Sequence, residues 1–233
     1  MPNHVLLNNV EHQDLRVITR RGADLGDQVM FAVTFPDEFR SIQAHFPIVF
    51  RKTAEQPAFQ PIALFGFTED QNLFLRGEHW DAHYLPLAIE RQPFLIGNSQ
   101  GEQVIHIDLD SPRVSRSEGE PLFRTHGGHT EYLERMSSVL GTIHHGLQRN
   151  VGFIDALLAH DLLESFVMDI ELSDGSSNRL AGFYTINEDR LGSLSGSVLE
   201  QLNQQGYLSA IYMAVASLSQ FRELIDRVNQ TQC

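Results

Sequence analysis

The spacing of apolar residues changes near residue 130, and this change constrains the fold more than any other feature of the chain. Before it, short runs rich in β-branched and aromatic residues alternate with turn residues, a pattern typical of strands. After it, apolar residues recur every three or four positions, as they do on one face of a helix. The sequence therefore predicts an α+β fold, with a mixed, mainly antiparallel sheet and with helices concentrated in the C-terminal half.

Two supersecondary units are predicted in the first half. Strands over residues 29–35 and 48–51 flank a short helix over residues 36–45, because a proline and two acids suit a first helical turn, and the three elements form a β-α-β unit. The clearest strand signal is a hairpin with strands over residues 62–67 and 72–76, which four turn residues connect.

The remainder of the first half has weaker patterns. Prolines interrupt residues 80–94, so we expect an irregular connection with one helical turn. The segment over residues 111–121 is polar and carries two prolines, and we expect it to be an exposed loop. Further strands are predicted over residues 14–19, 94–97 and 103–109.

The second half is predicted to be mostly helical, with one hairpin over residues 166–172 and 180–186 around a polar turn at 173–178. His144 and His145 are expected to end the first helix, since imidazolium groups are favourable at the negative end of a helix dipole. The apolar face between Tyr207 and Asn229 belongs in a core or in the seam of a homodimer. No repeat or linker divides the chain, so residues 1–233 are expected to form a single domain. The helices are predicted over residues 130–145, 152–159, 195–204 and 207–229.

The charge of the chain bears on its partners and its location. Thirty Asp and Glu residues against seventeen Lys and Arg residues give a net charge of −13, so nucleic acid is not expected as a partner. No run of about 18 apolar residues predicts a membrane span. The first residues lack the cationic start and apolar stretch of a signal peptide, which predicts a cytoplasmic protein. The one cysteine, Cys233, allows no disulfide within the chain and no thiolate metal cage.

Two histidine clusters suggest chemistry, and each has a simpler interpretation. His79 and His83 would bind a metal if their segment were helical, but the Glu that follows the first His in zinc-enzyme motifs is absent, so we expect surface or packing histidines. His126 and His129 flank two glycines that could present N–H groups to an anion. We favour a turn there, with Thr130 as the N-cap of the next helix. No bound metal and no cofactor are predicted.

Two other segments bring oxygen atoms together without assembling a recognisable catalytic motif. The segment from Gly192 to Gly196 resembles a nucleophile elbow, but its central residue is Leu194, so we expect a loop and a helix cap instead of a serine hydrolase. Asp108 and Asp110 follow a strand and could meet a divalent ion, although acids at strand ends are commonly solvated. Neither segment predicts an enzyme by itself.

The candidate ligand site consists of aromatic residues and one arginine, the residue types that are enriched at recognition sites. A packing role is an equally natural interpretation in a chain with fifteen phenylalanines. The candidate residues are Trp80, Tyr84, Arg91 and Phe94.

A series of hydrophobic and turn motifs carries a family resemblance. They include Phe31-Ala32-Val33, Phe46-Pro47-Ile48-Val49-Phe50, Pro61-Ile62-Ala63-Leu64-Phe65-Gly66-Phe67, Tyr84-Leu85-Pro86 and Arg91-Gln92-Pro93-Phe94. In this order they resemble the SapC family, a bacterial group of about this length. The resemblance implies a link to bacterial surface layers and to systems that contain TonB-dependent receptors, and with it an accessory role.

Three functions remain open from the sequence, and whether the protein is an enzyme stays undecided. The first is an accessory protein that binds a peptide or a small molecule near Trp80, Tyr84 and Arg91. The second is a metal-assisted or peptide-modifying enzyme, or a partner of one, that draws on the two histidine clusters. The third is a structural homo-oligomer that pairs through the helix from Tyr207 to Asn229.

Overall fold

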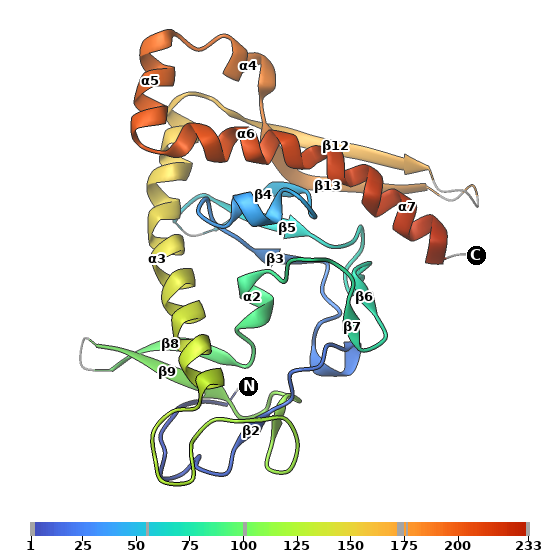
Figure 1. The fold of residues 1–233 in the computed structure, drawn as a ribbon. Helices are drawn as coiled ribbons and strands as arrows, with labels where there is room; N and C mark the ends of the chain where they lie inside the picture. The colour runs from blue at the N-terminus through green and yellow to red at the C-terminus, as the bar shows by residue number, and fades with distance from the viewer. Residues whose placement is uncertain (1–2, 55, 100–101, 172–174, 176, 232–233) are drawn as a thin grey trace. The chain divides into compact units, whose positions relative to one another are not determined.

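The computed structural model describes residues 3–54, 56–99, 102–171, 175 and 177–231, so Cys233 and half of the predicted turn at 173–178 lie outside the described residues. Antiparallel sheets and helices make up the fold, and the longest helices lie in the C-terminal half, which confirms the predicted α+β class (Figure 1). The chain divides into two compact units. Unit 1 contains residues 1–28, 75–81 and 87–145, and unit 2 contains residues 29–74, 82–86 and 146–233. That all 233 residues fold as one domain stays a prediction.

Unit 1 is built from three small sheets. In the first, β1 (His4–Leu6) and β8 (Phe94–Ser99) both pair antiparallel with β9 (Glu102–Asp108). In the second, β10 (Val114–Ser115) and β11 (Glu120–Pro121) flank β2 (Arg16–Val17), and in the third β6 (Leu75–Arg76) pairs with β7 (His79–Trp80). The unit also contains η1 (Ala23–Leu25), α2 (Leu87–Glu90) and the first half of α3 (Glu131–Ala159).

The strand pair predicted over residues 94–97 and 103–109 is confirmed as β8 and β9, while the strand predicted over residues 14–19 shortens to β2. The prediction that residues 111–121 form an exposed loop is right for residues 112 and 116–120, which are exposed, but wrong for the rest of the segment. Residues 111–121 contain the short strands β10 and β11. Arg113, which directly precedes β10, is only 1% exposed. The polar composition suggested solvent, but a charged side chain can be buried when an opposite charge accompanies it.

A hydrophobic cluster in unit 1 forms where the apolar face of α3 covers residues from β2, β8 and β9. Leu133 and Phe94 are completely buried in it. Burial of this kind contributes most of the favourable free energy of folding, at roughly 25 cal/mol per Å² of apolar surface. The buried members are Leu15, Val17, Phe94, Ile107, Leu122, Phe123, Leu133, Met136, Val139 and Leu140.

Unit 2 contains one five-stranded sheet in the order β12-β13-β4-β5-β3, in which every neighbouring pair is antiparallel. The strands β3 and β4 therefore run parallel to each other with β5 between them, and α1 lies in the connection. The predicted β-α-β unit is confirmed, and in the sheet a third strand, β5, lies between its two strands. The strands are β3 (Phe31–Val33), β4 (Ile48–Lys52), β5 (Phe59–Leu64), β12 (Leu163–Glu171) and β13 (Ser177–Ile186), and α1 is Phe39–Ile42.

Four helices follow the β12–β13 hairpin, and α6 lies against β13, β4 and α1 (Figure 1). The predicted last helix is interrupted, because a 3-10 turn separates α6 from α7. Ser217 accounts for part of this, since its hydroxyl both donates to the carbonyl of Ala214 and accepts the N–H of Ile48. The elements are α4 (Glu188–Gly192), α5 (Gly196–Gln204), α6 (Tyr207–Ser217), η2 (Leu218–Gln220) and α7 (Phe221–Thr231).

The core of unit 2 is aromatic. Phe46 packs edge-on against Phe65 and Phe74, with ring centroids 5.2 and 4.7 Å apart. Phe153 of α3 meets Phe39 at 5.9 Å, and further pairs join β5 to β13 and β12 to α7. Such pairs add about 0.5–1.5 kcal/mol each beyond the area that they bury.

The predicted hairpin over residues 62–67 and 72–76 is wrong. The first strand pairs with β3 and β4 instead, and Leu75 and Arg76 pair with β7. In the segment between them, side chains take the place of a partner strand, because the N–H of Phe67 donates to Gln71 Oε1 (2.7 Å) and that of Phe74 donates to Asn72 Oδ1 (3.0 Å).

The two helices predicted over residues 130–145 and 152–159 are one helix, α3, so the prediction that His144 and His145 end a helix is also wrong. The glycine that follows them does not interrupt the helix. A Cβ at Gly146 would overlap the ring of Phe35, so this glycine allows a ring to pack directly against the helix backbone.

Candidate functional site

The structure places the four predicted ligand residues in different surroundings. Trp80, half-buried, pairs with Leu75 across β6 and β7. Phe94 is completely buried in the cluster of unit 1, and Arg91 Nη1 donates to its carbonyl (2.6 Å). Tyr84 belongs to unit 2, where its hydroxyl donates to Glu38 Oε1 (2.9 Å). The structure thus brings Arg91 and Phe94 together, and the role of the set as a ligand site stays a prediction.

Arg91 lines a pocket of about 300 Å³ in unit 1, which we call the Arg91 pocket. Trp80, Tyr84 and Phe94 are not among its lining residues. The lining does contain polar and charged side chains from distant parts of the sequence, and these include His4, Asp108, Asp110 and Ser111. The pocket therefore joins the predicted arginine to Asp108, the last residue of β9, and to Asp110, which follows the strand.

Of the two acids in this pocket, Asp108 is held in a defined position. Asp108 Oδ1 accepts the backbone N–H groups of Asn3 (3.1 Å) and Asp110 (3.2 Å). Its other oxygen lies 3.9 Å from His4 Nε2. Asp110 is exposed to solvent. Because Arg91 is largely buried, the pKa of its guanidinium is lowered from the ordinary value. The pocket thus offers one guanidinium and two carboxylates to a ligand.

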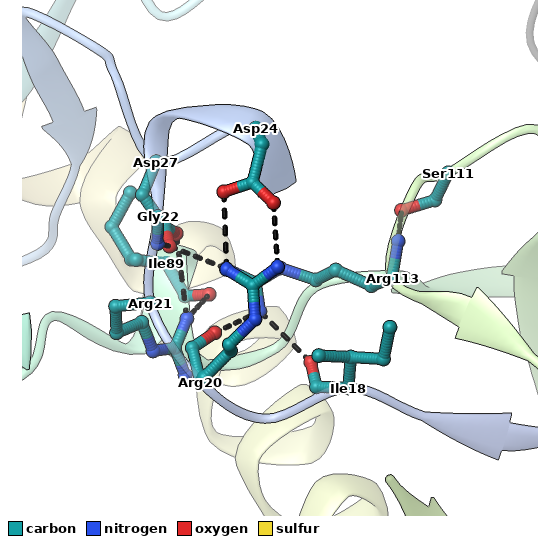
Figure 2. A network of polar contacts seen from close by, with 9 residues as sticks. All are labelled: Ile18, Arg20, Arg21, Gly22, Asp24, Asp27, Ile89, Ser111 and Arg113. Carbon is teal, nitrogen blue, oxygen red and sulfur yellow. Dashed lines mark hydrogen bonds and ion pairs between the residues drawn. The ribbon is translucent and has the colours of Figure 1, made fainter. Parts of the chain in front are cut away.

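Arg113 and Asp27 form a buried ion pair (Figure 2). In the sequence, each of the two directly follows a segment that lines the pocket. Arg113 Nη2 donates to Asp27 Oδ2 over 2.5 Å, and the two side chains are 1% and 0% exposed. Arg21, 13% exposed, approaches the other oxygen of Asp27 at 3.5 Å. Two guanidinium groups therefore share one buried carboxylate, which leaves one positive charge in excess.

The ion pair joins two loops of unit 1. Arg113 Nη1 donates to the carbonyls of Ile18 (3.0 Å) and Arg20 (2.9 Å), and Asp27 Oδ2 accepts the N–H of Gly22 (2.9 Å). One wall of the Arg91 pocket comes from residues 25–26 and another from residues 111–112. Each of these two walls is next in sequence to one member of the pair.

Burial near this ion pair also shifts the pKa values of Arg21 and Tyr132. Desolvation lowers the pKa of Arg21, and the neighbouring Arg113 lowers it further. Desolvation raises the pKa of Tyr132 to about 12, although the charges of Arg21 and Arg113 act in the opposite direction. Both groups thus keep their protons at neutral pH, so the cluster supplies fixed charge rather than a general acid or base.

The structure changes the interpretation of the histidine clusters. His79 lies in a strand, so the helical spacing that a metal site with His83 required is absent. His83 lies instead beside His45, with ring centroids 6.0 Å apart. Among the described residues, no three His, Cys, Asp or Glu side chains lie close enough together to hold a metal ion.

The segment from His126 to His129 is a turn, as predicted. Its two glycines have φ values of 87°, and Thr130 Oγ1 accepts the N–H of Leu133 (3.3 Å) at the start of α3. The predicted helix cap at Ser195 is confirmed too, because its side chain accepts the N–H of Val198. Capping accounts for the hydroxyl groups at these two positions.

A family model of SapC matches residues 7–224, nearly the full length of the 233-residue chain. The chain belongs to the SapC family. In this SapC protein the matched range contains Arg91, both Asp residues of the pocket and the buried ion pair, whereas His4 lies outside it. No curated protein and no solved structure matches the chain. Among the described residues, no helix of this SapC protein has the length and apolar character needed to cross a membrane.

Sequence reasoning missed Asp27 and Arg113. Eighty-six positions separate them, and each lies in a polar, turn-rich segment of the kind that normally faces solvent. No local pattern in this SapC protein distinguishes them from exposed charges. The one usable signal is Pro112, which restricts the backbone just before Arg113.

Proposed function

We propose that this SapC protein is a non-enzymatic binding protein that holds a small zwitterionic ligand, a free amino acid or the end of a peptide, in the Arg91 pocket. One observation carries the proposal. A guanidinium and two carboxylates line the same pocket, and a buried ion pair lies next in sequence to both of its walls. Groups held in place before binding lose little conformational entropy when a ligand arrives.

The charges of the pocket match the two ends of an amino acid. Arg91 uses Nη1 to bind the Phe94 carbonyl, and within the described chain its other N–H groups have no hydrogen-bond partner, so they can bind a carboxylate. Asp108 and Asp110 can accept hydrogen bonds from an ammonium group. A volume of about 300 Å³ is at the lower end of the range for ligand pockets, which favours a small ligand.

Isothermal titration calorimetry tests the proposal with free amino acids and with triglycine in four forms: uncapped, acetylated, amidated and capped at both ends. We expect the uncapped form to bind and each single cap to weaken binding by about tenfold, since each cap removes one charge pair. Arg91→Gln should abolish the difference in affinity between uncapped and amidated triglycine. Asp110→Asn should reduce the difference in affinity between uncapped and acetylated triglycine.

Arg179→Gln is the matched control, because this arginine is 68% exposed and belongs to unit 2. It removes the same charge as Arg91→Gln and should leave binding unchanged. Thermal melting of each variant checks that the fold persists. Absence of heat from every amino acid and peptide, or equal binding of capped and uncapped triglycine, would contradict the proposal.

Other functional statements stay predictions. An accessory role in surface-layer or TonB-receptor systems rests on the family alone, and purification of native complexes tests it. A homodimer through the segment from Tyr207 to Asn229 is tested by light scattering; Ala210, Ile211 and Leu224 of that segment are already buried within the chain. Cell fractionation tests the cytoplasmic location.

A further inference from the structure

A second groove in unit 1, of about 740 Å³, brings together the side chains of Arg16, Arg116 and Arg124, and we call it the arginine groove. Asp14 is the acid among its lining residues. The chain as a whole carries 30 Asp and Glu residues against 17 Lys and Arg residues. A groove with three cations and one anion is therefore a local reversal of the overall charge.

The sheet around β2 assembles this groove. Arg16 lies in β2, Arg116 directly follows β10, and Arg124 lies in the turn between β11 and α3. Because β10 and β11 both pair with β2, the three arginines converge although about a hundred residues separate the first from the other two. Arg16 Nε donates to the carbonyl of Gly119 (2.9 Å), which fixes the direction of that guanidinium.

The protein neutralises little of this positive charge. Arg124 Nη2 lies 3.9 Å from Glu134 Oε1, and the two side chains are 58% and 60% exposed. Exposed pairs of this kind contribute little, about 0–1 kcal/mol. Arg116 is exposed and makes no hydrogen bond or ion pair with any residue that the structure describes. Its guanidinium is available to a ligand.

The groove also has an apolar component, which limits the class of ligand. Leu15, Pro121 and Phe123 line it, and Pro121 offers the more accessible apolar surface, because Leu15 and Phe123 are only 3% and 7% exposed. A free phosphate would meet the arginines but would leave this apolar surface and most of the volume unused. An extended peptide with spaced carboxylates has both the carbon skeleton and the anions that the groove accommodates.

We propose that the arginine groove binds an acidic peptide segment, with Glu or Asp side chains on the guanidinium groups and the peptide chain over the apolar surface. This site is separate from the Arg91 pocket in its lining residues and in its chemistry, because it recognises side-chain carboxylates and does not need a free end of the peptide.

Fluorescence anisotropy tests the proposal with a labelled peptide of alternating Glu and Ala, acetylated and amidated so that the Arg91 pocket has no free end to bind. The matched probe replaces every Glu by Gln. We expect the Glu peptide to bind at low salt, the Gln peptide to bind at least about tenfold more weakly, and added salt to weaken the binding of the Glu peptide.

The variants use the two exposed arginines, whose loss should not affect folding. Arg116→Gln combined with Arg124→Gln should weaken binding of the Glu peptide about tenfold, as expected for two exposed charge pairs. Arg179→Gln and Arg91→Gln should leave it unchanged. Equal binding of the two peptides, no effect of the double variant, or tighter binding of inorganic phosphate or of a single-stranded oligonucleotide than of the Glu peptide would each overturn the proposal.

Discussion

The two units of this protein are stabilised in different ways. Unit 1 has small sheets with strands of two to seven residues, and it contains the buried pair of Asp27 and Arg113. Unit 2 has one five-stranded sheet with an aromatic core, and its buried Glu38 accepts hydrogen bonds from the hydroxyls of Thr34 (2.7 Å) and Tyr84 (2.9 Å). The Arg91 pocket and the arginine groove both lie in unit 1.

This difference shows how loops can acquire a defined shape without a large sheet. Connecting segments tend to be mobile because few apolar contacts hold them. A buried ion pair with additional hydrogen bonds to carbonyl groups orients the segments that carry it. Any arrangement that separates the two charges costs free energy. In unit 1 the pair fixes the segments beside the Arg91 pocket, whereas packing of rings fixes unit 2.

Breaking the ion pair should have the largest effect. Arg113→Met leaves Asp27 as a buried charge without its closest cation, and we expect the free energy of unfolding to fall by roughly 3–5 kcal/mol. Denaturant unfolding measures this loss. Hydrogen exchange should show that the amides of residues 18–27 and 111–115 lose the most protection.

The double variant Arg113→Met with Asp27→Leu is the control for that experiment. It removes both charges of the pair, and Arg21, which then loses its carboxylate, is 13% exposed and can reach water, so the double variant should be more stable than Arg113→Met alone. If Arg113→Met cost less than about 1 kcal/mol, the pair would behave like a surface ion pair, and the contrast between the units would be lost.

Overpacking the aromatic core of unit 2 should have the next largest effect. Gly146→Ala places a methyl group on the ring of Phe35, and we expect a loss of about 1–3 kcal/mol. Gly141 is the matched control on the same helix, because a Cβ there meets open space. Gly141→Ala should stabilise the protein by up to about 1 kcal/mol, since alanine has the higher helix propensity. Equal effects at the two positions would show that the ring can move aside.

The sequence predicted what depends on neighbours in the chain. Helical periodicity located α5, and the local strand patterns located β8 with β9 and β12 with β13. The error at α3 has a physical cause: a glycine and two histidines indicate a helix end when only neighbours are considered, but Phe35, far away in the sequence, explains Gly146. Similarly, local signals located β3 and β4 as strands, but they could not show that β5 pairs with both of them.

The candidate site was predictable only in part, for the same reason. Arg91 was identified by its residue type and lies in a pocket, and Asp108 and Asp110 had been noted at the end of a strand. The sequence could not show that these residues share a pocket, because β1, β9 and the connection after α2 must first assemble. Aromatic residues near Arg91 were a poor guide, since Phe94 is completely buried.

A smaller effect is expected at Tyr132, which reports on the charges of unit 1. Its phenol should titrate at a pKa of about 12, above the ordinary 10.0, because burial disfavours the phenolate. Ultraviolet titration should show a phenol that ionises with a pKa of about 12, and its absence from Tyr132→Phe identifies it. In Arg113→Met the pKa should rise further, because a cation that favours the phenolate is removed. An unshifted tyrosine would show that water reaches this part of unit 1.

The smallest effect is expected at His45 in unit 2, where no ion pair is involved. Burial lowers the pKa of His45 from 6.5, and the neighbouring His83 lowers it further. The unfolded chain therefore binds more protons than the folded chain just below pH 6.5, so stability should fall as pH falls through this window. Denaturant unfolding at about pH 7.5 and about pH 5.5 measures the change.

His83→Gln separates the two causes of the His45 shift. It removes the charge of the neighbour and keeps most of the burial, so the pKa of His45, followed by NMR, should rise only part of the way toward 6.5. His45→Gln should reduce the loss of stability between the two pH values. If His83→Gln restored the ordinary pKa completely, charge and not burial would dominate at this position. Unit 2 would then depend on electrostatics here as unit 1 does at Asp27, and the contrast between the units would have to be redrawn.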